Sequence, residues 1–218
     1  MSETDSFIEE VTEEVRRDKL FAAFRKYGWI AVLAILLLVG GAAWREWQKS
    51  QATAAAQAFG DAILFALEKT EPADRIVALQ GIDAPGPQGQ AVLSLLIAAE
   101  QGAAEQDAAA VQTLQALANQ PEVPEVYRDI ARFKALSRAG DSMSLAERRT
   151  ELESMAVPGM PLRMLAEEQL AFLSIEEGDT DAAIKRLNDI IADAETTAGL
   201  RRRAAQLIVA LGGVPEDA

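Results

Sequence analysis

The chain has 218 residues, with 34 acidic side chains, 21 basic side chains, no cysteine and no histidine. These counts exclude a disulfide framework, a thiolate nucleophile, a Ser-His-Asp triad and a zinc site built from cysteine or histidine. The net charge of −13 argues against nucleic-acid binding, which needs a basic surface, and abundant alanine with only 6% aromatic residues predicts an all-α protein.

Residues 1–26 form the first predicted segment, a cytoplasmic amphipathic leader. Phe7, Val11 and Val15 recur every four residues, which places them on one narrow apolar stripe of a helix. Two interpretations stay open for this leader: a solvated helix that precedes the next segment, or a helix that docks on a cytoplasmic or membrane partner.

Residues 27–44 contain no charged side chain. As a helix this run is about 27 Å long, close to the roughly 30 Å hydrocarbon core of a bilayer. Tyr27 and Trp29 lie at its first end, and Trp44 and Trp47 at its second, which is typical of the two membrane–water interfaces. The run therefore predicts a single transmembrane helix in contact with the lipid bilayer.

Two other interpretations of this run are a buried core helix and a cleaved signal peptide. A core helix that is apolar around its whole circumference needs a large domain around it. The small residues Gly41, Ala42 and Ala43 are compatible with cleavage, but the region before the run is long and acidic, which is atypical of a signal peptide. We therefore expect an uncleaved anchor.

The distribution of basic residues predicts the orientation of the anchor. Five basic residues precede the anchor and two follow it closely. They are Arg16, Arg17, Lys19, Arg25 and Lys26 before it, and Arg45 and Lys49 after it. Because Lys and Arg concentrate on the cytoplasmic side, we expect a cytoplasmic N-terminus and a periplasmic C-terminal domain at a bacterial inner membrane.

Residues 45–89 are predicted to be a juxtamembrane helix and a linker. Helices are expected over 50–69 and 74–80, and the Gly- and Pro-rich residues 81–89 predict a loop. The apolar face of the first of these helices is formed by Ala55, Phe59, Ile63 and Leu67.

Residues 90–218 are predicted to form a periplasmic array of α-hairpins similar to tetratricopeptide repeats. Three Leu/Ile-Ala pairs lie 33 and 40 residues apart, on either side of the roughly 34-residue period of these repeats. The pairs are Ile97-Ala98, Ile130-Ala131 and Leu170-Ala171. The alternative is an alanine-rich helical bundle with coincidental spacing. The predicted helices cover residues 90–101, 106–119, 125–139, 144–156, 162–177, 180–194 and 198–211.

The last hairpin fits the repeat pattern best. Gly178 marks its turn, and the small residues Ala171 and Ala183 allow its two helices to approach closely. The middle hairpin fits less well, because residues 140–144 lengthen its turn.

Neighbouring carboxylates could in principle do acid–base chemistry, as in Glu167-Glu168 and Glu176-Glu177. Adjacent residues of a helix point in different directions, so these pairs are predicted to lie on solvated faces instead.

Arginines 201–203 could bind an acidic partner or lipid headgroups, but are predicted to balance nearby acids. Those acids are Asp189, Asp193 and Glu195. Three methionines surround a Pro-Gly-Met-Pro turn and could form an adaptable binding surface. We expect packing between hairpins for Met155, Met160 and Met164.

The layout of the chain resembles the ancillary SecYEG translocon subunit family. The resemblance rests on the leader from Phe7 to Gly28, on the anchor that ends in Trp44-Arg45-Glu46-Trp47, and on the alanine-rich helix and degenerate repeats that follow. The resemblance implies a single-pass inner-membrane protein with a periplasmic tetratricopeptide-like domain. It also implies a non-enzymatic role beside the translocation channel, with periplasmic chaperones as co-workers. That family has no catalytic residues to carry over.

The function expected from these observations is that of a membrane-anchored scaffold or chaperone-like accessory of the SecYEG translocon. Its expected partners are the translocon, periplasmic chaperones or exported clients. No catalytic, cofactor-binding or metal site, no nucleic acid and no small-molecule substrate are expected. The alternative is an envelope interaction module for cell division or outer-membrane biogenesis, and a hydrolase with a carboxylate pair is the third candidate. The binding surface, the clients and the oligomeric state do not follow from the sequence.

Overall fold

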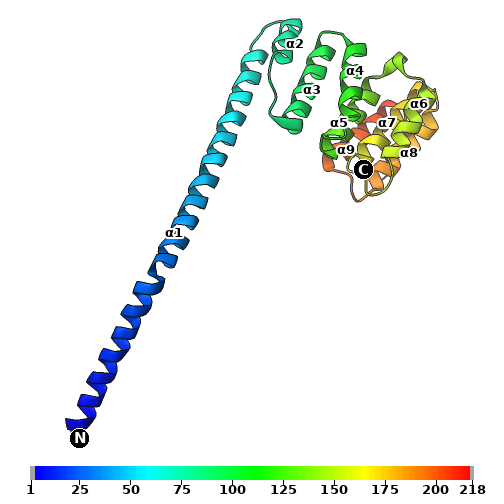
Figure 1. The fold of residues 1–218 in the computed structure, drawn as a ribbon. Helices are drawn as coiled ribbons and strands as arrows, with labels where there is room; N and C mark the ends of the chain where they lie inside the picture. Colours follow the sequence, from blue (N-terminus) through cyan, green and yellow to red (C-terminus); the bar gives the residue numbers. More distant parts are fainter. Residues whose placement is uncertain (1–2, 217–218) are drawn as a thin grey trace. The chain divides into compact units, whose positions relative to one another are not determined.

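The computed structural model describes the backbone of residues 3–216 and the side chains of residues 25–216, apart from Ala31 and Asp141. All regular elements of this part are helices and none is a strand, which confirms the predicted all-α fold class (Figure 1). In chain order they are α1 (Glu3–Leu67), α2 (Pro72–Gln80), α3 (Gly86–Ala103), α4 (Asp107–Ala118), α5 (Glu125–Arg138), the 3-10 turn η1 (Gly140–Ser142), α6 (Leu145–Met155), α7 (Arg163–Glu176), α8 (Thr180–Ala192) and α9 (Ala198–Ala210).

The first compact unit, which ends at Gln57, consists of α1 alone in the described part. Every described side chain from Arg25 to Gln57 is exposed, including those of the apolar run apart from Ala31. The rings of Trp44 and Trp47 contact each other, with their centroids 5.3 Å apart. The predicted leader stripe of Phe7, Val11 and Val15 lies outside the side chains that the structure describes.

The second unit begins at Ala58, where the end of α1 packs on α2 and α3. The predicted apolar face of this helix is confirmed for three of its four members, and Ala55 is exposed instead. This cluster is formed by Phe59, Ile63, Ala66 and Leu67 of α1 with Ile76, Leu79, Leu93 and Ile97. Arg75 of α2 adds an ion pair of 2.6 Å to Glu100 of α3.

The loop predicted over residues 81–89 is too long, because α3 begins at Gly86 and not at residue 90. A proline in the first turn of a helix is tolerated, since the N–H that it lacks has no partner within the helix. Pro87 therefore lies inside α3 and does not end the loop. The first turn of α3 also requires a glycine at position 89, because a Cβ atom there would lie 2.8 Å from the Cδ atom of Pro85.

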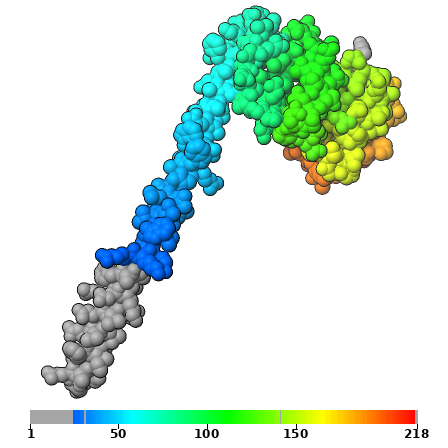
Figure 2. All heavy atoms as spheres, in the orientation of Figure 1, coloured from blue at the N-terminus to red at the C-terminus, as the bar shows by residue number. Residues whose placement is uncertain are grey.

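From α2 to α9 each helix packs mainly against its neighbours in the chain, and α3 also contacts α5. The second unit is thus a one-dimensional array of hairpins. Segments that follow one another in the sequence lie next to each other on its surface, from cyan through green to yellow and orange (Figure 2). Helices α4 to α9 begin and end within two residues of their predicted bounds. The predicted small residues of the hairpins are buried, with Ala131, Ala171 and Ala183 at 0%, 1% and 0% exposure, whereas Ile130 is half-buried. Gly178 turns the α7–α8 hairpin with a φ of +81°.

Candidate interaction surface

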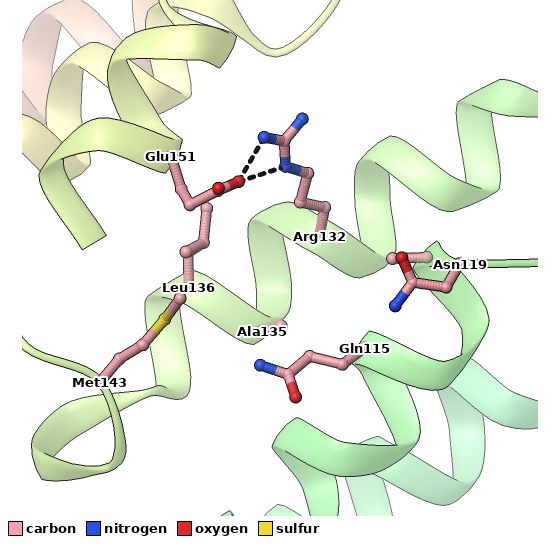
Figure 3. Close-up of a pocket in the computed structure, with 8 residues that line it drawn as sticks. Gln115, Asn119, Arg132, Ala135, Leu136, Met143 and Glu151 are labelled. Atoms are coloured by element: carbon pink, nitrogen blue, oxygen red, sulfur yellow. Dashed lines mark hydrogen bonds and ion pairs between the residues drawn. The ribbon is translucent and has the colours of Figure 1, made fainter. Parts of the chain in front are cut away.

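A groove opens between α4, α5 and α6, with a volume of about 400 Å³. Its lining combines apolar and polar side chains from three successive helices and from the turn before α6 (Figure 3). We call it the α4–α6 groove, and its lining residues are Gln115, Ala118, Asn119, Arg132, Ala135, Leu136, Met143 and Glu151.

The groove forms where the middle hairpin is least tightly packed. Residues 140–144 fold as η1 and an extended step instead of a tight turn, which confirms the lengthened turn of this hairpin. Gly140 adopts a φ of +45°, a conformation that side chains rarely permit. Ser144 then starts α6 with a capping box, because its hydroxyl accepts from the N–H of Glu147, whose carboxylate accepts from Ser144. These hydrogen bonds from the Ser144 hydroxyl and N–H lower the pKa of Glu147.

An ion pair joins the two sides of the groove. Arg132 of α5 donates two hydrogen bonds to Glu151 of α6, one from Nε at 2.9 Å and one from Nη2. Its Nη2 also donates to the hydroxyl of Ser154, at 3.0 Å. On the α4 side, Gln115 and Asn119 lie one helical turn apart and are exposed (Figure 3). Within the described side chains, neither of these two amides has a hydrogen-bond partner. The sequence offered only a weak signal for this site, namely two polar residues at i and i+4 beside a lengthened turn.

A second cavity of about 340 Å³ lies between the turn before α7 and the start of α9. Met160 and Met164 line it together with Leu165 and Leu200. Met155 instead is buried in the core between α6 and α7, at 2% exposure. The expected packing role is therefore confirmed for Met155 and also for Met164, which packs against the hydrophobic cluster of α7, α8 and α9 as well as bordering the cavity. Met160 lines the cavity.

The first carboxylate pair lies in ion pairs between helices, which corrects the prediction of a solvated face. Glu167 pairs with Arg186 of α8. Glu168 is buried at 6% exposure and accepts from Nε and Nη2 of Arg203 of α9, at 2.9 and 2.8 Å. The two neighbours do point in different directions, toward different helices.

The second carboxylate pair, at the end of α7, is exposed, which confirms the prediction of a solvated face, and it also forms ion pairs to α6. Glu176 pairs with Arg148 at 2.6 Å, and Glu177 pairs with Arg149 at 2.5 Å. Within the described side chains, no three acidic residues come together as a metal site would require.

The arginine triplet divides its roles: one member balances an acid as predicted, but that acid is Glu168 and not Asp189, Asp193 or Glu195. Arg202 is exposed, and Arg203 pairs with Glu168. Arg201 donates to three backbone carbonyls, that of Ile191 at the end of α8 and those of Asp193 and Thr196 in the α8–α9 loop.

The acids of that loop are paired with an arginine from another helix. Arg163 at the start of α7 donates to Asp193 at 2.8 Å and to Glu195 at 2.7 Å. The hydrogen bond from Arg163, with a second from the N–H of Glu195, holds the pKa of Asp193 below its ordinary value. The hydrogen bonds that Arg163 donates to the side chains of Asp193, first, and of Glu195 raise the pKa of Arg163. Asp189 pairs with Lys185 on its own helix at 3.1 Å.

Stacked hairpins with a lateral groove and helix-to-helix ion pairs define this molecule as an α-helical repeat protein. The profile of the tetratricopeptide repeat-like domain matches residues 24–138, and the chain belongs to this family. Domains of this family are typically non-catalytic and mediate contacts between proteins. Comparison with curated proteins and with solved structures found no match.

Proposed function

We propose that this protein is a single-pass, membrane-anchored interaction module that assists protein export beside the SecYEG translocon. The observation that carries the proposal is the joining of two parts in one chain, an apolar helix and a repeat array of a protein-binding family. The array supplies a surface for proteins, and the anchor raises its local concentration at the membrane.

The anchor is supported by the exposure of the apolar helix. Arg25–Leu67 is the one described helix that is long and apolar enough to cross a membrane, and none of its most apolar window is buried. An apolar surface of this length is unfavourable in water and favourable in a bilayer. The paired rings of Trp44 and Trp47 are suited to a membrane–water interface.

A topology measurement tests the anchor and its orientation. Because the chain has no cysteine, Thr12→Cys and Thr53→Cys each introduce a single thiol, one on each side of the apolar run. In intact cells, a membrane-impermeant maleimide should label Cys at position 53 and not at position 12 until the cells are lysed. Release of a shortened, soluble chain that carries position 53 would instead identify the run as a cleaved signal peptide.

The partner assignment rests on the resemblance of the leader and anchor, and a crosslinking experiment tests it. Tagged full-length protein is crosslinked in membranes, purified in mild detergent and analysed by mass spectrometry. We expect components of the translocation channel together with periplasmic chaperones. Recovery of division or outer-membrane assembly proteins without any channel component would replace the export role with another envelope role.

A leader variant tests whether residues 1–26 dock on a partner. Glu13→Lys with Glu14→Lys reverses two charges and leaves the excess of basic residues before the anchor in place. Loss of partners in this variant, at unchanged topology, would support docking. Unchanged co-purification would show that the leader only precedes the anchor.

A further inference from the structure

The cavity between the turn before α7 and the start of α9 has an aliphatic wall. Its volume of about 340 Å³ lies at the lower end of the range for small-molecule sites. Five carbon-rich side chains form the wall, namely those of Met160, Pro161, Met164, Leu165 and Leu200. No aromatic ring is among the described lining residues, so the wall offers no stacking surface for a flat ligand. It is suited to a flexible aliphatic chain, to which methionine adapts.

Two arginines line the same cavity, and each has one guanidinium nitrogen to spare. Arg163 uses Nε and Nη2 for its bonds to Asp193 and Glu195. Arg203 likewise uses Nε and Nη2 for its bonds to Glu168. Among the described atoms, the Nη1 group of either arginine has no hydrogen-bond partner. Each Nη1 carries two N–H donors, and a carboxylate is the acceptor that fits a guanidinium best.

The first turn of α9 adds backbone donors beside the cavity. Thr197 and Leu200 line the cavity, and the Thr197 hydroxyl accepts from the N–H of Leu200. The N–H groups of Ala198 and Gly199 have no partner in the part of the chain that the structure describes. Unpaired N–H groups at the start of a helix, together with the helix dipole, favour an anion. The helix start and the two arginines thus favour the same kind of ligand group.

The charge of the lining selects a ligand with a single negative charge. The charged lining residues are Arg163, Arg203 and Glu195, which sum to one positive charge in a chain whose net charge is −13. A second negative charge on the ligand would be repelled by Glu195. A phosphate monoester carries close to two negative charges at neutral pH, so a carboxylate fits the lining better.

We propose that this cavity, which we call the α7–α9 cavity, binds an alkanoate, that is, a small aliphatic carboxylate. Arg163 and Arg203 recognise its carboxylate, and the aliphatic wall holds its tail. The volume has room for about eleven groups of the size of a water molecule, so the tail is limited to about eight carbons. This binding function goes beyond the proposed role in export and does not depend on it.

Methionine methyl signals of the full-length protein in a neutral detergent locate the ligand. The five methionines are labelled with ¹³C at their methyl groups, and methionine-to-leucine variants assign the signals. Titration with hexanoate should shift the signals of Met160 and Met164 until they saturate. The signals of Met143 and Met155 should stay in place, because these side chains pack between other helices. Equal shifts of all four signals, or no saturable shift, would overturn the proposal.

Two analogues separate the recognition of the carboxylate from that of the tail. Hexanamide keeps the tail without the charge, and acetate keeps the charge without the tail. Each should bind at least about tenfold more weakly than hexanoate, because a charged hydrogen-bond acceptor and a buried aliphatic tail each contribute that factor. Equal binding of hexanamide would contradict the role of the arginines, and equal binding of acetate would contradict that of the wall.

Arg163→Gln tests the arginine and should weaken hexanoate at least about tenfold, with little change for hexanamide. Arg202→Gln is the matched control, because Arg202 is an exposed arginine of α9 outside the lining. It should change the affinity for hexanoate less than about twofold. Equal weakening by the two variants would show attraction by general positive charge and overturn the assignment to this cavity.

Met160→Trp fills the cavity and removes none of its ion pairs, so the signal of Met164 should no longer respond to hexanoate. Val157→Trp is the control, because Val157 is exposed in the same turn and lies outside the lining. Unchanged signals of Met143 and Met155 show that each variant keeps its fold. A full response of Met160→Trp to hexanoate would overturn the proposal.

Acetyl-alanyl-leucine, which has a free carboxylate, distinguishes a small molecule from the end of a polypeptide. It should bind more weakly than hexanoate, because its peptide groups would lose their hydration against the aliphatic wall. Tighter binding of this peptide would assign the cavity to a protein C-terminus and overturn the alkanoate proposal. None of these readouts involves membrane partners, so failure here leaves the proposed export role in place, and failure of that role leaves this site in place.

Discussion

Glu168 of α7 and Arg203 of α9 form a two-pronged ion pair across 35 positions of sequence, with Nε–Oε1 and Nη2–Oε2 distances of 2.9 and 2.8 Å. The carboxylate side chain is 8% exposed and the guanidinium side chain 53% exposed, so the acid depends on the arginine for its solvation. Hydrogen bonding to Glu168 raises the pKa of Arg203. The pair connects the helices that flank α8, and it is a contact between non-neighbouring elements of the array.

Removing the arginine should therefore destabilise the array. Arg203→Ala leaves a buried, unpaired carboxylate and should lower the free energy of unfolding by about 2 kcal/mol, below the loss for a fully buried pair because the arginine is half exposed. Arg202→Ala, which removes an exposed neighbour, should change it by less than about 0.5 kcal/mol. Urea unfolding of the full chain in detergent, followed by circular dichroism, measures both. Equal losses in the two variants would contradict this role of the pair.

The ion pairs show where sequence-based prediction reached its limit. Helix bounds followed from apolar periodicity and from Gly and Pro breaks, which are local properties of the chain. The partner of Glu168 depends on how three successive helices pack, and no local pattern encodes that packing. The sequence therefore predicts a solvated face for Glu167 and Glu168, although each of them pairs with an arginine of a different helix.

The α4–α6 groove was missed for a related reason. Its polar residues, Gln115 and Asn119, look like an ordinary solvated face in the sequence. They become a site only because the lengthened turn at residues 140–144 opens the middle hairpin beside them. The sequence did predict this turn, but the space that it leaves depends on the packing of α4, α5 and α6.

Two glycines of α3 should respond differently to alanine. At Gly89 the new Cβ atom would lie 2.8 Å from the rigid ring of Pro85, so Gly89→Ala should cost about 1 kcal/mol. At Gly102 it would meet the end of the flexible Arg138 side chain, which can move at the expense of its surface ion pair with Asp107. The gain in helix propensity offsets that loss, so Gly102→Ala should stay within about 0.5 kcal/mol of the original chain. Thermal unfolding distinguishes the two, and a larger cost at position 102 would contradict the expectation.

The close approach of α7 and α8 should not tolerate a larger side chain. Ala183 is 0% exposed on α8, which packs against α7. Ala183→Leu should overpack this interface and destabilise the chain by about 1–3 kcal/mol. Ala192→Leu places the same side chain on an exposed position of the same helix and serves as the control. Equal free energies of unfolding for the two variants, measured with urea, would show that the α7–α8 interface accommodates a leucine at position 183.

The Arg163–Asp193 pair predicts a specific acid sensitivity. Because the folded state lowers the pKa of Asp193, its ionised form stabilises the fold above the ordinary aspartate pKa of about 3.9, and this contribution is lost as the pH falls through the lower folded value. The difference in unfolding free energy between the original chain and Asp193→Asn should therefore be constant above about pH 5 and shrink below about pH 4. Arg201 holds the backbone of the same loop through carbonyl groups, which do not titrate, so the loop should keep part of its order in acid.

Asp189→Asn is the control for this titration, because Asp189 pairs only with an exposed lysine of its own helix in the described part of the chain. An exposed pair at i and i+4 contributes little, so this variant should differ from the original chain by less than about 0.5 kcal/mol at every pH. Urea unfolding at pH 3, 4, 5 and 7 measures both differences. A difference for Asp193→Asn that stays constant or grows toward pH 3 would mean that Arg163 does not stabilise the ionised form of Asp193.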